Sequence, residues 1–319
     1  MKIRDFTPDD YTAIVSIHNS LGIVWPEAPR TPEGWAQADR NRNPGYPFRR
    51  WVAVAGGDVV GLAAFWQSRM DYRRRWFNVN VEVSPSHWRQ GIGAALYDQI
   101  MAALQPFDPP ILRADAFTNL PQGFRFLQKR GFYEAFRETP VHLEIASFDP
   151  APYAGLEPRL LAGGIVVKTL RELESDPNRD RKTYDLYWDI SDDVPQEEPR
   201  MVAPEFGEWI KWGLHDPTVL HDAYFIAVCG DEYAGLGEWS KDPDNDVLQG
   251  GLLGVRRAYR KQGIGLLLHL RAIAYAREHG CPVLKTCTAI QNAPMQAIFN
   301  RLRFARDPEW QQCQKDITP

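Results

Sequence analysis

The chain contains the same pattern of motifs twice, and this repeat constrains its fold more than any other feature. The segments VSPSHWRQGIGAAL (83–96) and VRRAYRKQGIGLLL (255–268) align. Three landmarks keep offsets of 172, 173 and 172 positions between the copies: Gly91 and Gly263, Asn119 and Asn292, Phe132 and Phe304. The pattern predicts a two-copy duplication, since a solenoid would need more and shorter repeats.

The repeat also predicts the domain organisation. A chain of 319 residues is long enough for two domains, each with its own core. We expect an N-terminal domain at 1–150 and a C-terminal domain at 164–319. The intervening stretch, 151–163, lies in a segment with Pro and Gly at both ends and is predicted to be a linker.

Each copy predicts a mixed α/β domain with helices on both faces of a twisted sheet. Apolar residues at Ile92, Leu96, Ile100 and Leu104 recur every four positions, which is typical of a helix directly after the GIG triplet. Irregular stretches are expected at 21–48 and 189–219. The other predicted pieces are paired between copies: opening strands at 2–5 and 165–169, strands before GIG at 77–83 and 247–255, and later strands at 111–116 and 282–288.

Composition narrows the classes of partner. The net charge of −4 argues against a nucleic-acid backbone as partner. No stretch approaches 18 apolar residues, and the opening MKIRDFTPDDY has no apolar leader region, so we expect neither membrane span nor secretion signal. The four cysteines show no zinc-type spacing. Together these features predict a cytoplasmic protein with reduced thiols.

The GIG segment joins a strand to a helix and is suited to bind an anion. Glycines let backbone N–H groups approach a ligand closely, and a helix start adds unpaired donors and a positive dipole end. Arg89, Arg260 and Lys261 add positive charge beside the two loops. The pattern predicts a phosphate or pyrophosphate cradle. It lacks the G-K-[ST] of a Walker loop, and Leu96 and Leu268 replace the third glycine of a dinucleotide fingerprint.

The two loops resemble the acyl-CoA loop of the GNAT superfamily of N-acetyltransferases, V-x-P-x-x-[R/Q]-x-x-G-x-[G/A]. VRRAYRKQGIG (255–265) lacks only the proline, and VSPSHWRQGIG (83–93) keeps the proline but has Trp88 at the basic position. An asparagine about twelve residues before a final phenylalanine, Asn119 and Asn292, resembles the family's second landmark. The resemblance covers nearly the whole chain and implies two tandem GNAT-like domains.

The resemblance implies acetyl transfer from acetyl-CoA to an amine of a small molecule, without a metal. It also implies a binding site in each copy, and the complete RKQGIG run makes us expect the stronger one in the second. The implied cofactor-binding residues are Val81, Val83, Arg89, Gln90, Gly91, Ile92, Gly93, Ala94 and Asn119 in the first copy, and Leu253, Val255, Arg260, Lys261, Gln262, Gly263, Ile264, Gly265, Leu266 and Asn292 in the second.

Candidate proton-transfer groups are few. Glu82 and Glu238, each on a strand, are the candidate general bases. The tyrosine that the family often uses to protonate the leaving thiolate is replaced by Leu127 and Phe299. Intact loops without acid or base would instead fit a non-catalytic CoA-binding or scaffold protein, and transfer of another acyl group is a further alternative.

An acidic segment in the second copy suggests the charge of the acceptor. Residues 189–198 hold five acids and no base, and acids at a cleft mouth attract cations. Asp192 and Asp193 are therefore candidate substrate-binding residues for a cationic amine.

Overall fold

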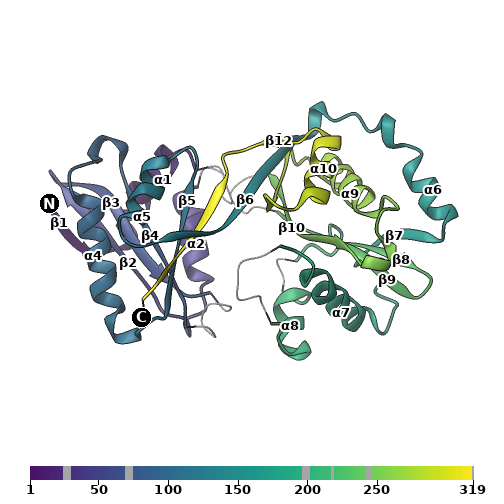
Figure 1. The fold of residues 1–319 in the computed structure, drawn as a ribbon, viewed down its shortest axis with the longest axis horizontal. Helices are drawn as coiled ribbons and strands as arrows, with labels where there is room; N and C mark the ends of the chain where they lie inside the picture. Colours follow the sequence, from purple (N-terminus) through teal and green to yellow (C-terminus); the bar gives the residue numbers. More distant parts are fainter. Residues whose placement is uncertain (24–29, 69–74, 196–201, 217–218, 242–245, 318–319) are drawn as a thin grey trace. The chain divides into compact units, whose positions relative to one another are not determined.

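A computed structural model describes residues 1–23, 30–68, 75–195, 202–216, 219–241 and 246–317 (Figure 1). The chain packs as two compact units, residues 1–138 with 308–319 and residues 139–307. These ranges differ from the expected domains, because the last residues of the chain belong to the first unit and 139–163 belong to the second. None of the described helices is long and apolar enough to cross a membrane.

The first unit consists of a mixed sheet with two layers of helices. Its order along the chain is β1 (Lys2–Asp5), α1 (Tyr11–Ser20), α2 (Pro32–Arg40), β2 (Phe48–Ala55), β3 (Asp58–Trp66), β4 (Phe77–Val83), α4 (Ile92–Leu104), β5 (Ile111–Phe117), α5 (Pro121–Gln128), the first half of β6 (Tyr133–Glu144) and β13 (Trp310–Asp316). Short 3-10 turns precede α1 and α4 and follow α4, at Pro8–Asp10, Pro85–His87 and Gln105–Phe107.

The C-terminal strand completes the sheet of the first unit. β13 lies between β5 and β6 and pairs antiparallel with both, so that Cys313 is opposite Ala114 on one side and Glu134 on the other (Figure 1). The remaining order is β1-β2-β3-β4-β5, antiparallel except for the parallel pair β4–β5. Residues 310–316 therefore supply an interior strand of a sheet whose first strand is residues 2–5.

Both faces of the first sheet are covered. Residues of α4 and α5 pack on one face, where Trp51, Phe65 and Phe77 form a core with Leu96 and Ile100. On the other face, Ile14 and Ile17 of α1 pack against Val52 and Leu62. The stripe predicted after GIG is confirmed: its four members, from Ile92 to Leu104, are all buried.

The second unit has the corresponding arrangement. It contains the second half of β6, α6 (Leu156–Ala162), β7 (Ile165–Thr169), α7 (Arg179–Ser191), α8 (Phe206–Gly213), β8 (Phe225–Cys229), β9 (Glu232–Lys241), β10 (Val247–Val255), α9 (Ile264–Glu278), β11 (Val283–Ala289), α10 (Ala293–Leu302) and β12 (Ala305–Arg306). The sheet order is β6-β11-β10-β9-β8-β7, with β12 beside β6. Helices α9 and α10 pack on one face, and α7 and α8 pack on the other.

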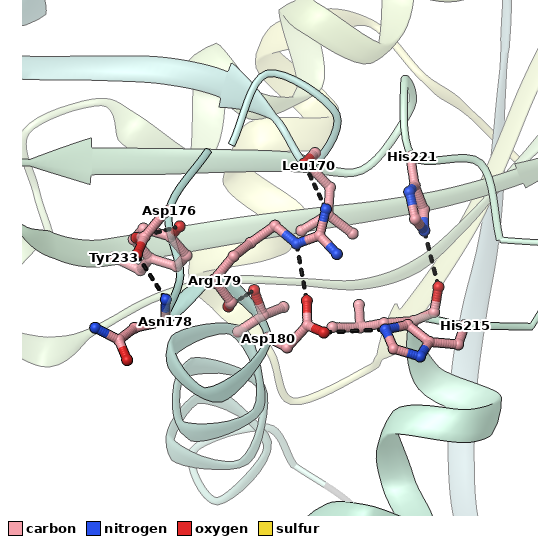
Figure 2. Close-up of polar contacts among 10 residues, drawn as sticks. Leu170, Asp176, Asn178, Arg179, Asp180, His215, His221 and Tyr233 are labelled. Atoms are coloured by element: carbon pink, nitrogen blue, oxygen red, sulfur yellow. Dashed lines mark hydrogen bonds and ion pairs between the residues drawn. The ribbon is translucent and has the colours of Figure 1, made fainter. Parts of the chain in front are cut away.

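A polar network fixes the start of α7 against the sheet (Figure 2). Arg179 donates from Nε to Asp180 and from Nη1 to the carbonyl of Leu170. The other Asp180 oxygen lies 2.9 Å from Nε2 of His215, just after α8. Asp176 accepts hydrogen bonds from the Tyr233 hydroxyl of β9 and from the backbone N–H of Asn178. These contacts fix the start of α7 in the second unit.

Three predicted segments differ in structure from expectation. The irregular stretches contain helices, α2 in the first copy and α8 in the second. Thr31 starts α2 by accepting a hydrogen bond from the backbone N–H of Gly34. The expected linker contains α6, whose Leu160 is buried in the core of the second unit. Apolar contacts order these short segments, although their sequence periodicity is too brief to predict them.

Candidate active site

In both copies the strand before GIG separates from its parallel neighbour. β4 pairs with β5 only at Phe77 and Asn78, although it stays paired with β3 as far as Val83. Likewise, β10 pairs with β11 only at 247–249. Backbone groups at the ends of β4 and β10 that point away from the antiparallel partner are thus left for a ligand. The unpaired ends include Val81, Val83, Leu253 and Val255, which the resemblance implies as cofactor-binding residues.

The first GIG loop is open to a ligand. Gly91 is in the left-handed region, with φ +82°, at the N-cap of α4, and a Cβ there would meet no described atom within 4 Å. Trp88 holds the loop to the strand by donating its indole N–H to the carbonyl of Val83, 2.7 Å away. The position that is basic in the family pattern is therefore structural here. No side chain caps α4 among the described residues, so its first amides suit an anion.

A cavity of about 450 Å³ adjoins this loop. It is lined by Val81, Glu82, Val83, Arg89, Gly91, Ile92, Gly93 and Ala94 of the predicted set. Two predicted residues do not line it: Gln90 reaches the carbonyl of Ser86, and Asn119 donates to the carbonyl of Gly22. Arg125, Lys129 and Arg130 from α5 and its end add positive charge to the wall. Open amides and basic side chains suit a ligand that carries phosphate groups.

Glu82 lies where this cavity meets a second one of about 430 Å³. Its carboxylate is 6% exposed and lies 3.1 Å from Nδ1 of His18 on α1. Asn80 donates to the same carboxylate over 2.8 Å. The two cavities share Glu82 together with Leu21, Val81, Leu120 and Gly123. A carboxylate between a cofactor-sized and a substrate-sized space is placed to accept a proton.

The second cavity has aromatic and polar walls. Trp35, Phe48, Trp66, Phe117 and Trp310 line it. Arg50 also lines it and is held by Asp39, with Nη1 2.7 Å from Oδ2. A mostly apolar space with a few fixed polar groups is typical of a site for a small molecule.

The second GIG loop has the same backbone but different surroundings. Gly263 has φ +102°, and Arg260 replaces Trp88 as the donor to the strand, to the carbonyl of Val255. A Cβ at Gly263 would lie 2.9 Å from Leu156 Cδ1 and 3.1 Å from Arg159 Nη2, both on α6. Arg159 also donates to the carbonyl of Gln262 over 3.0 Å. The expected linker thus lies against this loop.

The remaining predicted residues of the second copy mainly serve packing. Asn292 caps α10 by accepting from the backbone N–H of Met295. Ile264 and Leu266 are buried, Leu253 and Val255 pack against the same core, and a Cβ on Gly265 would meet Ile298 at 3.3 Å. Lys261 has φ +64°, as Arg89 does at the equivalent position. Leu127 and Phe299, at the positions of the missing tyrosine, are core residues.

Glu238 and Glu82 are in unlike surroundings. Glu238 is half-buried in β9, and desolvation of its carboxyl by the surrounding protein raises its pKa, although a hydrogen bond from the backbone N–H of Leu252 opposes the shift. Position 254, equivalent to Glu82, is glycine, and a Cβ there would lie 2.3 Å from Cγ2 of Ile190. The second copy therefore has no counterpart of the Glu82 carboxylate at that position.

The two acidic candidates for substrate binding are in different surroundings. Asp193 accepts hydrogen bonds from Arg257 and Arg260, which lower its pKa to about 2. Its charge is thus used within the protein rather than offered to a cationic substrate. Asp192 is an exposed residue at the end of α7. Residues 196–198 of the acidic segment lie outside the described part.

Sequence reasoning missed three residues of the first site. His18 gave no signal, because no histidine has an equivalent in the other copy. Arg125 and Lys129 are four residues apart on or just after α5, a spacing that places two basic side chains on one helix face. That spacing is visible in the sequence, whereas the contact between His18 and Glu82 joins positions 64 residues apart.

Two mixed sheets, each with a strand that separates from its parallel neighbour beside a glycine loop at a helix start, are the arrangement of a tandem N-acetyltransferase fold. The chain belongs to the acetyltransferase (GNAT) family, whose model matches residues 14–132 and 181–304. It is 25% identical over 286 residues to a mycothiol acetyltransferase of Catenulispora acidiphila, covering 86% of this chain and 82% of that one.

Two solved structures share the tandem fold over the full chain. A GCN5-related N-acetyltransferase from Sphaerobacter thermophilus superposes with a TM-score of 0.75 and 17% identity, covering 100% of this chain and 96% of that one. A tandem GNAT protein from the clavulanic acid biosynthesis pathway also gives 0.75, with 20% identity and coverage of 100% and 99%. At these identities the likeness concerns the fold.

Proposed function

We propose that the protein transfers an acetyl group from acetyl-CoA to the amine of a small molecule, and that its first copy performs the chemistry. The observation that carries this proposal is Glu82, which is buried, hydrogen-bonded and shared by the walls of the two cavities. Bound acetyl-CoA would supply an activated thioester. The amide groups of the Gly91 loop and the basic residues of α5 would hold its phosphates.

Glu82 would remove the proton that an ammonium must lose before its nitrogen can attack a carbonyl. His18 and Asn80 hold the carboxylate in place. Amide groups at the end of β4 would stabilise the negative charge that develops on the carbonyl oxygen. We assign the role of protonating the leaving thiolate to none of these side chains.

Free-thiol release by the full chain tests the proposal, with acetyl-CoA and a panel of amines as substrates. The panel includes the amine that mycothiol acetyltransferase acetylates, because a relative bears that name. We expect amine-dependent release that follows formation of the acetylated product. CoA binding without turnover of any amine would favour a scaffold protein, and turnover only with longer acyl-CoAs would identify a different acyl transferase.

His18 is predicted to be a positioning residue. We expect His18→Ala to lower kcat about tenfold, because Glu82 loses one of two fixed partners, and to leave CoA affinity unchanged. His18→Asn keeps a hydrogen-bond donor and should recover most of the rate. Steady-state kinetics across pH check this. An unchanged pH profile and rate in His18→Ala would contradict the role.

A further inference from the structure

We infer that each chain binds one molecule of CoA, in the first copy, and that the second copy's loop is closed permanently by α6 and Asp193. The inference rests on the proposed function, whose cofactor it assigns to one of two loops. It reverses the expectation that the complete RKQGIG run marks the stronger site.

The glycine of the second loop faces protein rather than open space. Leu156 and Arg159 occupy the volume beside Gly263, whereas the same volume beside Gly91 holds no described atom within 4 Å.

The segment that carries Leu156 and Arg159 is fixed at several points. Tyr153 donates to the carbonyl of Arg301, Glu157 pairs with Arg271 of α9, and Arg277 donates to the carbonyl of Phe148. The cover is thus built into the second unit.

A carboxylate already occupies the arginines of the second loop. Asp193 has a 16% exposed side chain and bridges Arg257 and Arg260. Its low pKa shows that these arginines stabilise the negative charge. A phosphate would have to displace this intramolecular anion or bind next to it against repulsion. At the equivalent position the first copy has Leu21, a neutral residue that lines both cavities.

The proton-accepting position is filled as well. Where the first copy has His18 against Glu82, the second has Ile190 against Gly254. Both pairs keep the repeat offset of 172 residues. The second copy therefore has an apolar contact where the first copy has an ionisable one. The surroundings of Gly263, Asp193 and Gly254 therefore all support the inference that the second copy binds no CoA.

A matched pair of variants at one repeat position tests the inference. Arg89 and Lys261 are equivalent, have φ +64° in both cases and are exposed, so a glutamate at either should leave folding intact. Isothermal titration of the full chain with CoA should give one site. We expect Arg89→Glu to weaken CoA binding about tenfold or more, because the substitution removes a charge-assisted contact to a phosphate. Lys261→Glu should stay within about twofold, since its loop binds nothing.

Hydrogen exchange locates the site independently of activity. CoA should protect peptides that contain 89–95 and leave those that contain 261–267 unchanged. Two sites per chain, or equal losses in the two glutamate variants, would overturn the inference. If the chain bound two molecules of CoA and Arg159→Ala lost one of them, Arg159 would be a phosphate ligand, and this result would also overturn the inference. No binding at all would instead refute the proposed function.

Discussion

Glu82→Gln is expected to lower kcat by about 10²- to 10⁴-fold, the range of a lost general base. Glutamine has nearly the same shape and can still bond to His18 and Asn80, so the fold and the cavity should persist. It cannot accept a proton from an ammonium. CoA affinity should stay within about threefold, since no phosphate contact is removed. Thiol release and titration with CoA measure the two quantities separately.

The pH dependence of Glu82→Gln identifies the missing step. The unprotonated fraction of a free amine rises about tenfold per pH unit below its pKa, so the variant should regain rate toward high pH. Exposed Glu144 at the end of β6 supplies a control, and Glu144→Gln should match the natural chain. If Glu82→Gln keeps its rate while Glu238→Gln loses it, the chemistry lies in the second copy.

Cys313→Asp should destabilise the first unit by about 3 kcal/mol or more, the cost of an unpaired charge in a core. Cys313 is 1% exposed in the middle of β13 and contributes to the core beneath α4. Burial raises the pKa of its thiol to about 12, so the site disfavours a charge. Because β13 joins β5 to β6, its displacement should open both neighbouring strands.

Hydrogen exchange by segment measures this effect where it occurs. Peptides from β5 and from 133–138 should lose protection in Cys313→Asp, whereas peptides from β8 should keep it. Cys313→Val preserves apolar volume and should cost less than about 1.5 kcal/mol. Full protection of β5 in the aspartate variant would show that β13 is not needed to hold this strand.

The strands and loops around GIG could be predicted well from the sequence, because each copy shows the same local patterns. The strands expected at 77–83 and 247–255 have those bounds in the structure. The GIG loops fall at left-handed glycines that begin helices. Each prediction depends on a local pattern, and the backbone geometry of a loop is set largely by local residues.

The local sequence does not predict which segment of the chain forms the strand between β5 and β6. Residues 310–316 pair with residues 111–117 and 133–138, between 172 and 205 positions away. Alternation within a short strand says nothing about which partner it joins. The loop motifs alone do not distinguish the two copies. The residues that make the second loop different, Leu156 and Asp193, lie far from its glycines in the sequence. Motif completeness therefore does not predict that Leu156 and Arg159 lie beside Gly263 in the second loop.

The placement of β13 also affects the order of synthesis. Glu138 is made 172 residues before Trp310, which corresponds to roughly 10–35 s at ribosomal rates. During that time β5 and β6 of the nascent chain lack the strand that lies between them, and two open edges are exposed to other chains. The first unit can be completed only after residues 310–316 have left the ribosome, when the second copy has already been made. The two copies are therefore not interchangeable, and recombination between them would separate the sheet of the first unit from one of its interior strands.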